Sequence, residues 1–210
     1  MRYWLLVFSL LFPGLVLAQG DAGLVNLVSG DVSYAPQSGS PAKATAFMKV
    51  REGDRFTVPA GASVRLVYFQ GGRQEAFSGP SSFTAGAQQS SVQSGAQPQV
   101  TTLPSGVPQR IARVPELMQN AKLGGIQVRG QPPAKRAPDG FVREAQATYE
   151  AMKKEMPGND ITPELFLYSA LNEYQLYEEM SPVVQEMLRK QPASEDVRAL
   201  ADWLKTRRGR

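Results

Sequence analysis

The side chains in this sequence that could take part in chemistry are carboxylates, lysines, tyrosines and hydroxyls, because the chain contains no cysteine and no histidine. Without those two residue types there is no thiolate nucleophile, no serine–histidine pair and no Cys/His zinc site. Disulfide bonds are excluded as well, so each domain must be stabilised by its own core. Any catalysis would therefore depend on carboxylates, lysine, tyrosine or serine alone.

Two groupings of acids are worth considering. Asp31, Glu52 and Asp54 could converge on a hard cation, but they lack the alternating Asp/Asn spacing that supplies the roughly 6–8 oxygens of a Ca²⁺ site. Turn residues that accept hydrogen bonds from nearby amides explain them better. Glu52 and Glu75 could form a glycosidase-type pair, although only the presence of two carboxylates supports it. We therefore predict a protein that is not an enzyme and that holds no metal and no cofactor.

The first 18 residues have the pattern of a secretory signal peptide. Arg2 precedes an apolar run over residues 3–12, and Val16 and Ala18 place small residues before Gln19. The alternative is an uncleaved membrane anchor, but the run is shorter than the ~20 residues that span a bilayer. We expect cleavage between Ala18 and Gln19, which gives a periplasmic or secreted protein.

Residues 22–104 are predicted to form a β domain, because short apolar runs alternate with glycine turns. Residues 23–35 are predicted to be a hairpin in which Leu24, Asn26 and Val28 share one face. The run 64–69 is apolar on both faces except at Arg65, which favours a central strand. Residues 86–105 are uncharged and rich in Gln, Ser and Gly, so they are predicted to be an extended connector, in which residues 100–103 could add an edge strand.

Four short motifs in this region resemble the FecR domain family. They are Gly30-Asp31-Val32, the run from Glu52 to Pro59, the run from Gly61 to Leu66, and Gly71-Gly72-Arg73. The resemblance covers residues 22–85. It implies a compact all-β periplasmic module, either a small sandwich or a short solenoid, that binds other proteins. Members of the family that regulate a sigma factor have a cytoplasmic region before their membrane helix, and this pattern is not found before residue 3. A free-standing exported interaction module is the implication that remains.

Residues 105–138 are predicted to be a basic linker rich in proline and glycine, with six basic residues and one acidic residue. Helical spacing of apolar residues continues to Leu123, but Pro115 interrupts it, so a short helix over residues 115–123 is expected. The positive charge could bind peptidoglycan or a membrane surface; simple solvation is the other interpretation.

Residues 139–207 are predicted to be helical, with Asp139 as one N-cap, a second helix beginning at Thr162, and Ser194 capping the last. The run from Glu164 to Pro192 resembles a tetratricopeptide repeat, in a degenerate form. The predicted fold class is α+β, with a separate β module and a small helical bundle. Four aromatic residues are candidates for a peptide-binding groove, with a purely structural core as the alternative: Tyr168, Tyr174, Tyr177 and Trp203.

The function favoured by these patterns is an exported, non-enzymatic interaction or scaffold protein whose partner is another envelope protein. The alternative is a module that binds peptidoglycan or polysaccharide, and a carboxylate-based hydrolase is the third hypothesis. Nothing in the sequence indicates nucleic-acid binding: the positive charge is modest and gathers in the predicted linker.

Overall fold

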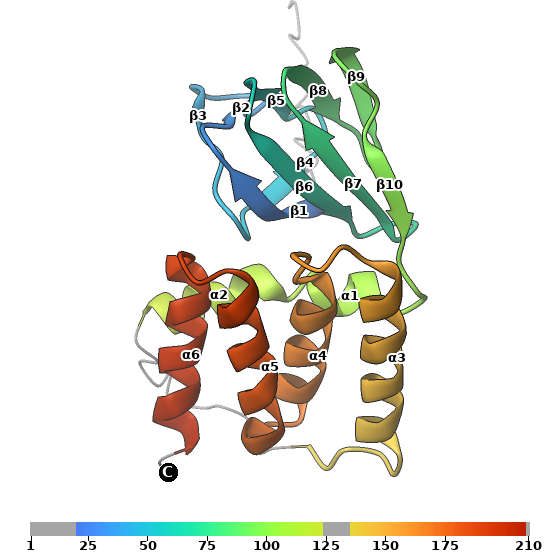
Figure 1. The fold of residues 1–210 in the computed structure, drawn as a ribbon, viewed down its shortest axis with the longest axis vertical. Helices are drawn as coiled ribbons and strands as arrows, with labels where there is room; N and C mark the ends of the chain where they lie inside the picture. Colours follow the sequence, from blue (N-terminus) through green and yellow to red (C-terminus); the bar gives the residue numbers. More distant parts are fainter. Residues whose placement is uncertain (1–19, 124–134, 209–210) are drawn as a thin grey trace, which may run out of the picture.

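The computed structural model describes residues 20–123 and 135–208, and it has two parts (Figure 1). Two antiparallel β-sheets make up the first part, and six helices follow them. The predicted α+β class is therefore confirmed. The predicted signal peptide, with its cleavage site at Ala18 and Gln19, lies outside the described residues.

Sheet A, the first of the two, faces the helices. Its central strand is β6 (Ser63–Tyr68), the strand that the apolar run predicted. In spatial order the sheet contains β10 (Gln99–Thr102), β7 (Arg73–Ser78), β6, β1 (Asp21–Ser29) and β4 (Lys49–Arg51). The turn between β6 and β7 uses Gly71 and Gly72, whose φ angles of 77° and 63° favour glycine.

Sheet B packs on the other face of sheet A, which makes the β part a sandwich. Its spatial order is β3 (Ala42–Lys43), β2 (Ser33–Ala35), β5 (Arg55–Val58), β8 (Ser81–Ala85) and β9 (Ser90–Ser94). Between the sheets lies an apolar core in which the rings of Phe56, Phe77 and Phe83 stack. Each fully buried side chain of this size contributes about 1.5–3 kcal/mol relative to an exposed one.

The hairpin predicted over residues 23–35 is wrong. β1 pairs with β4 and β6 in sheet A, whereas β2 pairs with β3 and β5 in sheet B. The chain changes sheets near Gly30, whose φ is 79° and where an added Cβ would lie 2.8 Å from the Cβ of Ala62. Turn residues here therefore carry the chain from one sheet to the other.

A β-bulge at Asn26 also changes the predicted faces of β1. The pairing of β1 with β6 shifts between Val25 and Leu27. Leu24 belongs to the core shared with the helices, and Asn26 faces them as well. Val28, which alternation placed on the same face, packs instead with Val25 in the sandwich core.

Residues 86–105 do not form a connector over most of their length. They supply β9, which pairs with β8, and β10, which pairs with β7. The edge strand expected at residues 100–103 is confirmed by β10. The hydroxyl and amide side chains that suggested a linker lie on two edge strands, where one face meets water.

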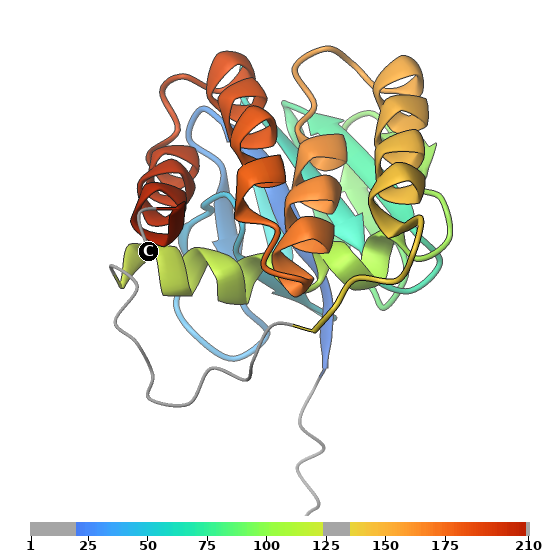
Figure 2. The same ribbon diagram turned by 90° about the horizontal axis from the view of Figure 1, so that it is seen from below.

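The helices form two groups (Figures 1 and 2). In one group, four helices stand side by side: α3 (Phe141–Glu155), α4 (Thr162–Glu173), α5 (Tyr177–Lys190) and α6 (Glu195–Arg208). In the other, α1 (Val107–Ile111) and α2 (Val114–Lys122) run across this row, and α1 contacts α4 while α2 contacts α6. α4 is the central helix, since every residue from Thr162 to Leu171 is buried.

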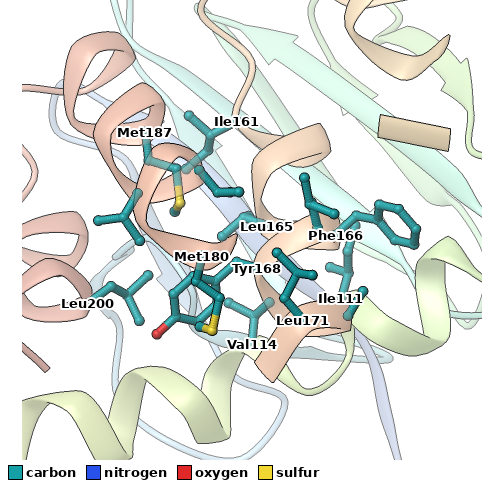
Figure 3. Close-up of a cluster of buried hydrophobic side chains, with 14 of the residues drawn as sticks. Ile111, Val114, Ile161, Leu165, Phe166, Tyr168, Leu171, Met180, Met187 and Leu200 are labelled. Carbon is teal, nitrogen blue, oxygen red and sulfur yellow. The ribbon is translucent and has the colours of Figure 1, made fainter. Parts of the chain in front are cut away.

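The predicted linker 105–138 is only partly a linker. The short helix expected at residues 115–123 is confirmed as α2, but α1 was not expected. Figure 3 shows Ile111 and Val114 from this stretch beside Leu165 and Leu171 of α4 in the helical core. Residues 124–134, which carry part of the predicted basic charge, lie outside the described residues.

One predicted helix cap is confirmed and two are wrong, although the second helix does begin at Thr162 as predicted. Ser194 Oγ accepts a hydrogen bond from the Val197 amide at 3.2 Å, as expected for a cap. Gly140, with φ of 82°, takes the N-cap position expected for Asp139. Thr162 is a helical residue rather than a cap, because the carboxylate of Asp160 accepts the hydrogen bond of its amide.

Candidate functional site

A buried ion pair joins sheet A to the start of α4. Arg65 Nη1 on β6 lies 3.3 Å from Asp160 Oδ1, and the two side chains are 9% and 0% exposed. Lys190 Nζ also donates to the backbone carbonyl of Asp160 at 2.8 Å. A charge this deeply buried is tolerated only when a partner compensates for its lost hydration. The pair therefore fixes where the helical part sits on the sheet.

Three further polar side chains surround this ion pair and extend the contact between sheet A and α4. We call the whole group the seam: Asn26, Arg65, Gln74, Asp160 and Thr162. Gln74 Nε2 donates to Asp160 Oδ2 at 2.6 Å, and Thr162 Oγ1 lies 2.7 Å from Gln74 Oε1. Asn26 Nδ2 donates to Thr162 Oγ1. Hydrogen bonds from β1 and β7, together with the ion pair from β6, thus hold one helix start.

A second buried cluster continues from the seam into the helices. Glu164 is fully buried, and both of its carboxylate oxygens lie 2.9 Å from Lys190 Nζ. Tyr149 on α3 donates its hydroxyl hydrogen to Glu164 Oε1 at 3.0 Å. Because Lys190 also binds the carbonyl of Asp160, a continuous chain of hydrogen bonds links Tyr149 to sheet A.

The ring of Tyr149 lines a surface groove between α3 and α5. This groove has a volume of about 250 Å³, and its floor is made by Tyr149, Leu167 and Val183. Its rim is formed by exposed residues of the two flanking helices: Gln146, Glu150, Glu179 and Pro182. Figure 2 shows α4, which supplies Leu167, between α3 and α5. An apolar floor with a polar rim is the usual anatomy of a protein-binding surface.

Acidic side chains surround the hydroxyl of Tyr149. Burial raises the pKa of Tyr149 above its usual range, and the carboxylates of Glu164, Glu186 and Glu150 raise it further. Lys153 Nζ lies 4.9 Å from the centre of the Tyr149 ring and 3.9 Å from Glu150 Oε1. One ammonium group of the chain itself is thus held over this aromatic ring and beside an acid.

The four aromatic candidates for partner binding do not share one surface. Tyr168 and Trp203 are buried, with 1% and 7% exposure, and Tyr168 lies inside the cluster of Figure 3. Tyr174 and Tyr177 are partly exposed; Tyr174 packs edge-on against Phe141 and Tyr177 against Trp203. The core alternative therefore describes Tyr168 and Trp203, and a binding role for the other two stays a prediction.

Sequence reasoning missed Tyr149 as a groove residue, because its helical spacing indicated only a core position. The available signal was its place beside Gln146 and Glu150, which the helical spacing along α3 puts at the edge of the apolar stripe.

The acids considered for chemistry are engaged in local contacts. Asp54 accepts a hydrogen bond from the Arg51 amide at 2.9 Å, which fits its predicted turn role. Asp31 pairs with Lys43 on the surface, and Glu52 is exposed in the turn after β4. Glu75 is buried, where it pairs with Arg73 and accepts a hydrogen bond from the Ser90 amide at 3.1 Å. Across residues 20–123 and 135–208, no group of three or more acids is arranged to hold a metal ion.

Comparisons with known proteins give no relative. No family model matches the chain, and neither a curated protein nor a solved structure is similar to it. Within the described part of the chain, none of the helices is long and apolar enough to cross a membrane.

Proposed function

We propose that this chain is an exported, non-enzymatic protein that binds another protein of the cell envelope through the groove between α3 and α5. The groove carries the proposal, because it offers an apolar floor and a charged rim on rigid helices. The seam supports the helices, because it ties α4 to three strands of the sandwich. A partner would meet a surface that is already formed, so little ordering entropy would oppose binding.

Two sequence features support the location and the class. The pattern of residues 1–18 is that of a secretory signal, which supports work outside the cytoplasm. The resemblance of residues 22–85 to the FecR domain family supports an interaction role. On this proposal the β sandwich is the platform, and the helical part presents the binding surface.

The groove is tested by site-specific photo-crosslinking in cells. A photoreactive residue at Gln146, on the rim, is compared with one at Thr57, an exposed position on sheet B. We expect one reproducible cross-linked protein from Gln146 and none from Thr57. Equal products at both positions, or none from Gln146, would contradict the proposal. In the second case, salt-sensitive sedimentation with peptidoglycan would favour the polymer-binding alternative.

Export is tested on the same cells by measuring the mass of the purified protein. An amino terminus at Gln19 is expected. A protein that retains Met1 would instead favour the membrane-anchor interpretation.

A further inference from the structure

The structure assigns a partner chemistry to the groove: we infer that it takes a peptide segment that carries an aliphatic side chain flanked by lysine or arginine. This inference rests on the proposed function and narrows it. The aliphatic side chain would lie on the floor made by Tyr149, Leu167 and Val183, and the cation beside the acids of the rim.

The charged residues of the groove rim are both acidic. Glu150 on α3 and Glu179 on α5 flank the groove, and both are exposed. Glu150 is close to Lys153, whereas Glu179 forms no ion pair with any other described residue. The lining residues include no basic side chain, and Lys153 lies beside Glu150, so Glu179 is the rim acid that an incoming cation can pair with. Opposite charges across an interface raise the association rate and suppress wrong partners.

The position of Lys153 shows that the groove accepts an ammonium group. Its Nζ is held over the Tyr149 ring and near Glu150 at the distances given above. A cation over an aromatic ring gains about 0.5–1 kcal/mol at an exposed site. A partner's lysine or arginine could pair with Glu179, the acid on the opposite side, without displacing Lys153.

The net positive charge of the protein argues against nonspecific binding of a basic peptide. The full chain has a net charge of +4, so its overall field repels a basic peptide. Binding of a basic segment would therefore reflect the acidic residues of the groove and not the net charge of the protein.

The test is a selection of random 12-residue peptides on the mature protein. We expect the enriched peptides to combine an aliphatic residue with nearby lysine or arginine. Enrichment of acidic or uncharged sequences, or no enrichment, would overturn the inference. An enriched peptide is then measured by titration calorimetry against the double variant Glu150→Lys, Glu179→Lys, where at least about tenfold weaker binding is expected.

A matched control separates the groove from overall charge. The double variant Glu52→Lys, Glu116→Lys makes the same change in net charge at exposed acids that do not line the groove. It should bind within about twofold of the unmodified protein, since distant exposed charges are screened by salt. Equal weakening by both double variants would overturn the inference.

The two proposals fail differently. If Gln146 still cross-links its partner in the Glu150→Lys, Glu179→Lys protein with unchanged yield, the partner chemistry is wrong and the groove remains the binding site. If Gln146 cross-links nothing in either protein, the proposed function itself is wrong.

Discussion

The two faces of sheet A are built differently. The face toward sheet B is apolar, with Val64, Leu66 and Phe77 in the sandwich core. The face toward the helices adds the polar seam to apolar contacts from Leu24 and Val67. An apolar core stabilises without direction, whereas hydrogen bonds and ion pairs require one geometry. The sandwich face thus supplies stability, and the helical face fixes how α4 is oriented.

The largest expected effect comes from the core that the apolar face of sheet A shares with sheet B. Phe83→Ala removes a fully buried ring that stacks on Phe77 and Phe56, so we expect a loss of about 3–5 kcal/mol in the free energy of unfolding. Denaturant unfolding of the mature protein measures it. Val100→Ala, at a 45% exposed position on β10, is the control and should change stability by less than about 0.5 kcal/mol. A similar loss in both variants would refute the packing described here.

The seam is tested by Asp160→Ala, which leaves Arg65 buried without its partner. Breaking a buried pair in this way typically costs about 3–5 kcal/mol of the free energy of unfolding. Because water still reaches part of Arg65, we expect a loss of about 3 kcal/mol. The double variant Asp160→Ala, Arg65→Met should recover part of the loss, because no buried charge is left unpaired. If the double variant is the less stable of the two, the ion pair does not hold the seam.

A smaller effect is expected where the seam reaches the groove. Tyr149→Phe keeps the ring on the groove floor but removes the hydrogen bond to Glu164, at a cost of about 1–2 kcal/mol. Tyr174→Phe, which alters a partly exposed tyrosine, should cost less than about 0.5 kcal/mol. Partner binding should survive Tyr149→Phe, because the ring remains. Loss of binding with unchanged stability would show that the hydroxyl itself contacts the partner.

The ionisation of buried tyrosines tests side-chain burial in the sandwich and in the helical part in one experiment. Burial is the main cause that raises the pKa of Tyr68 in the sandwich and of Tyr149 and Tyr168 among the helices. The fold favours their neutral form, so they contribute stability in full below about pH 10, and that contribution is lost as the pH rises from about 10 through their folded pKa values. An ultraviolet titration of the folded protein should show that these three tyrosines ionise only above about pH 10. A single transition near pH 10 for all of them, in folded protein, would contradict the burial.

Local patterns in the sequence predicted strands, turns and helix ends well where residues close together in the chain determine the structure. The apolar run at residues 64–69 became the central strand, and Gly71-Gly72 became a hairpin turn. The cap at Ser194 and the helix after Pro115 depend on nearby residues in the same way.

Contacts between distant residues could not be read from local patterns. Asn26 and Thr162 are 136 positions apart, and nothing in either neighbourhood points to the other. The signal that was present is that Asn26, Arg65 and Gln74 interrupt otherwise apolar or strand-forming runs. Polar residues on a buried face need partners, so they indicate a second layer on sheet A without saying which residues supply it.

The binding groove is the central claim, and hydrogen exchange of the mature protein with and without the captured partner tests it most directly. We expect slower exchange in the partner complex over residues 141–155 and 177–190, which form α3 and α5, with sheet B unchanged. Protection concentrated on β9 and β10, with α3 and α5 exchanging as in the free protein, would contradict it.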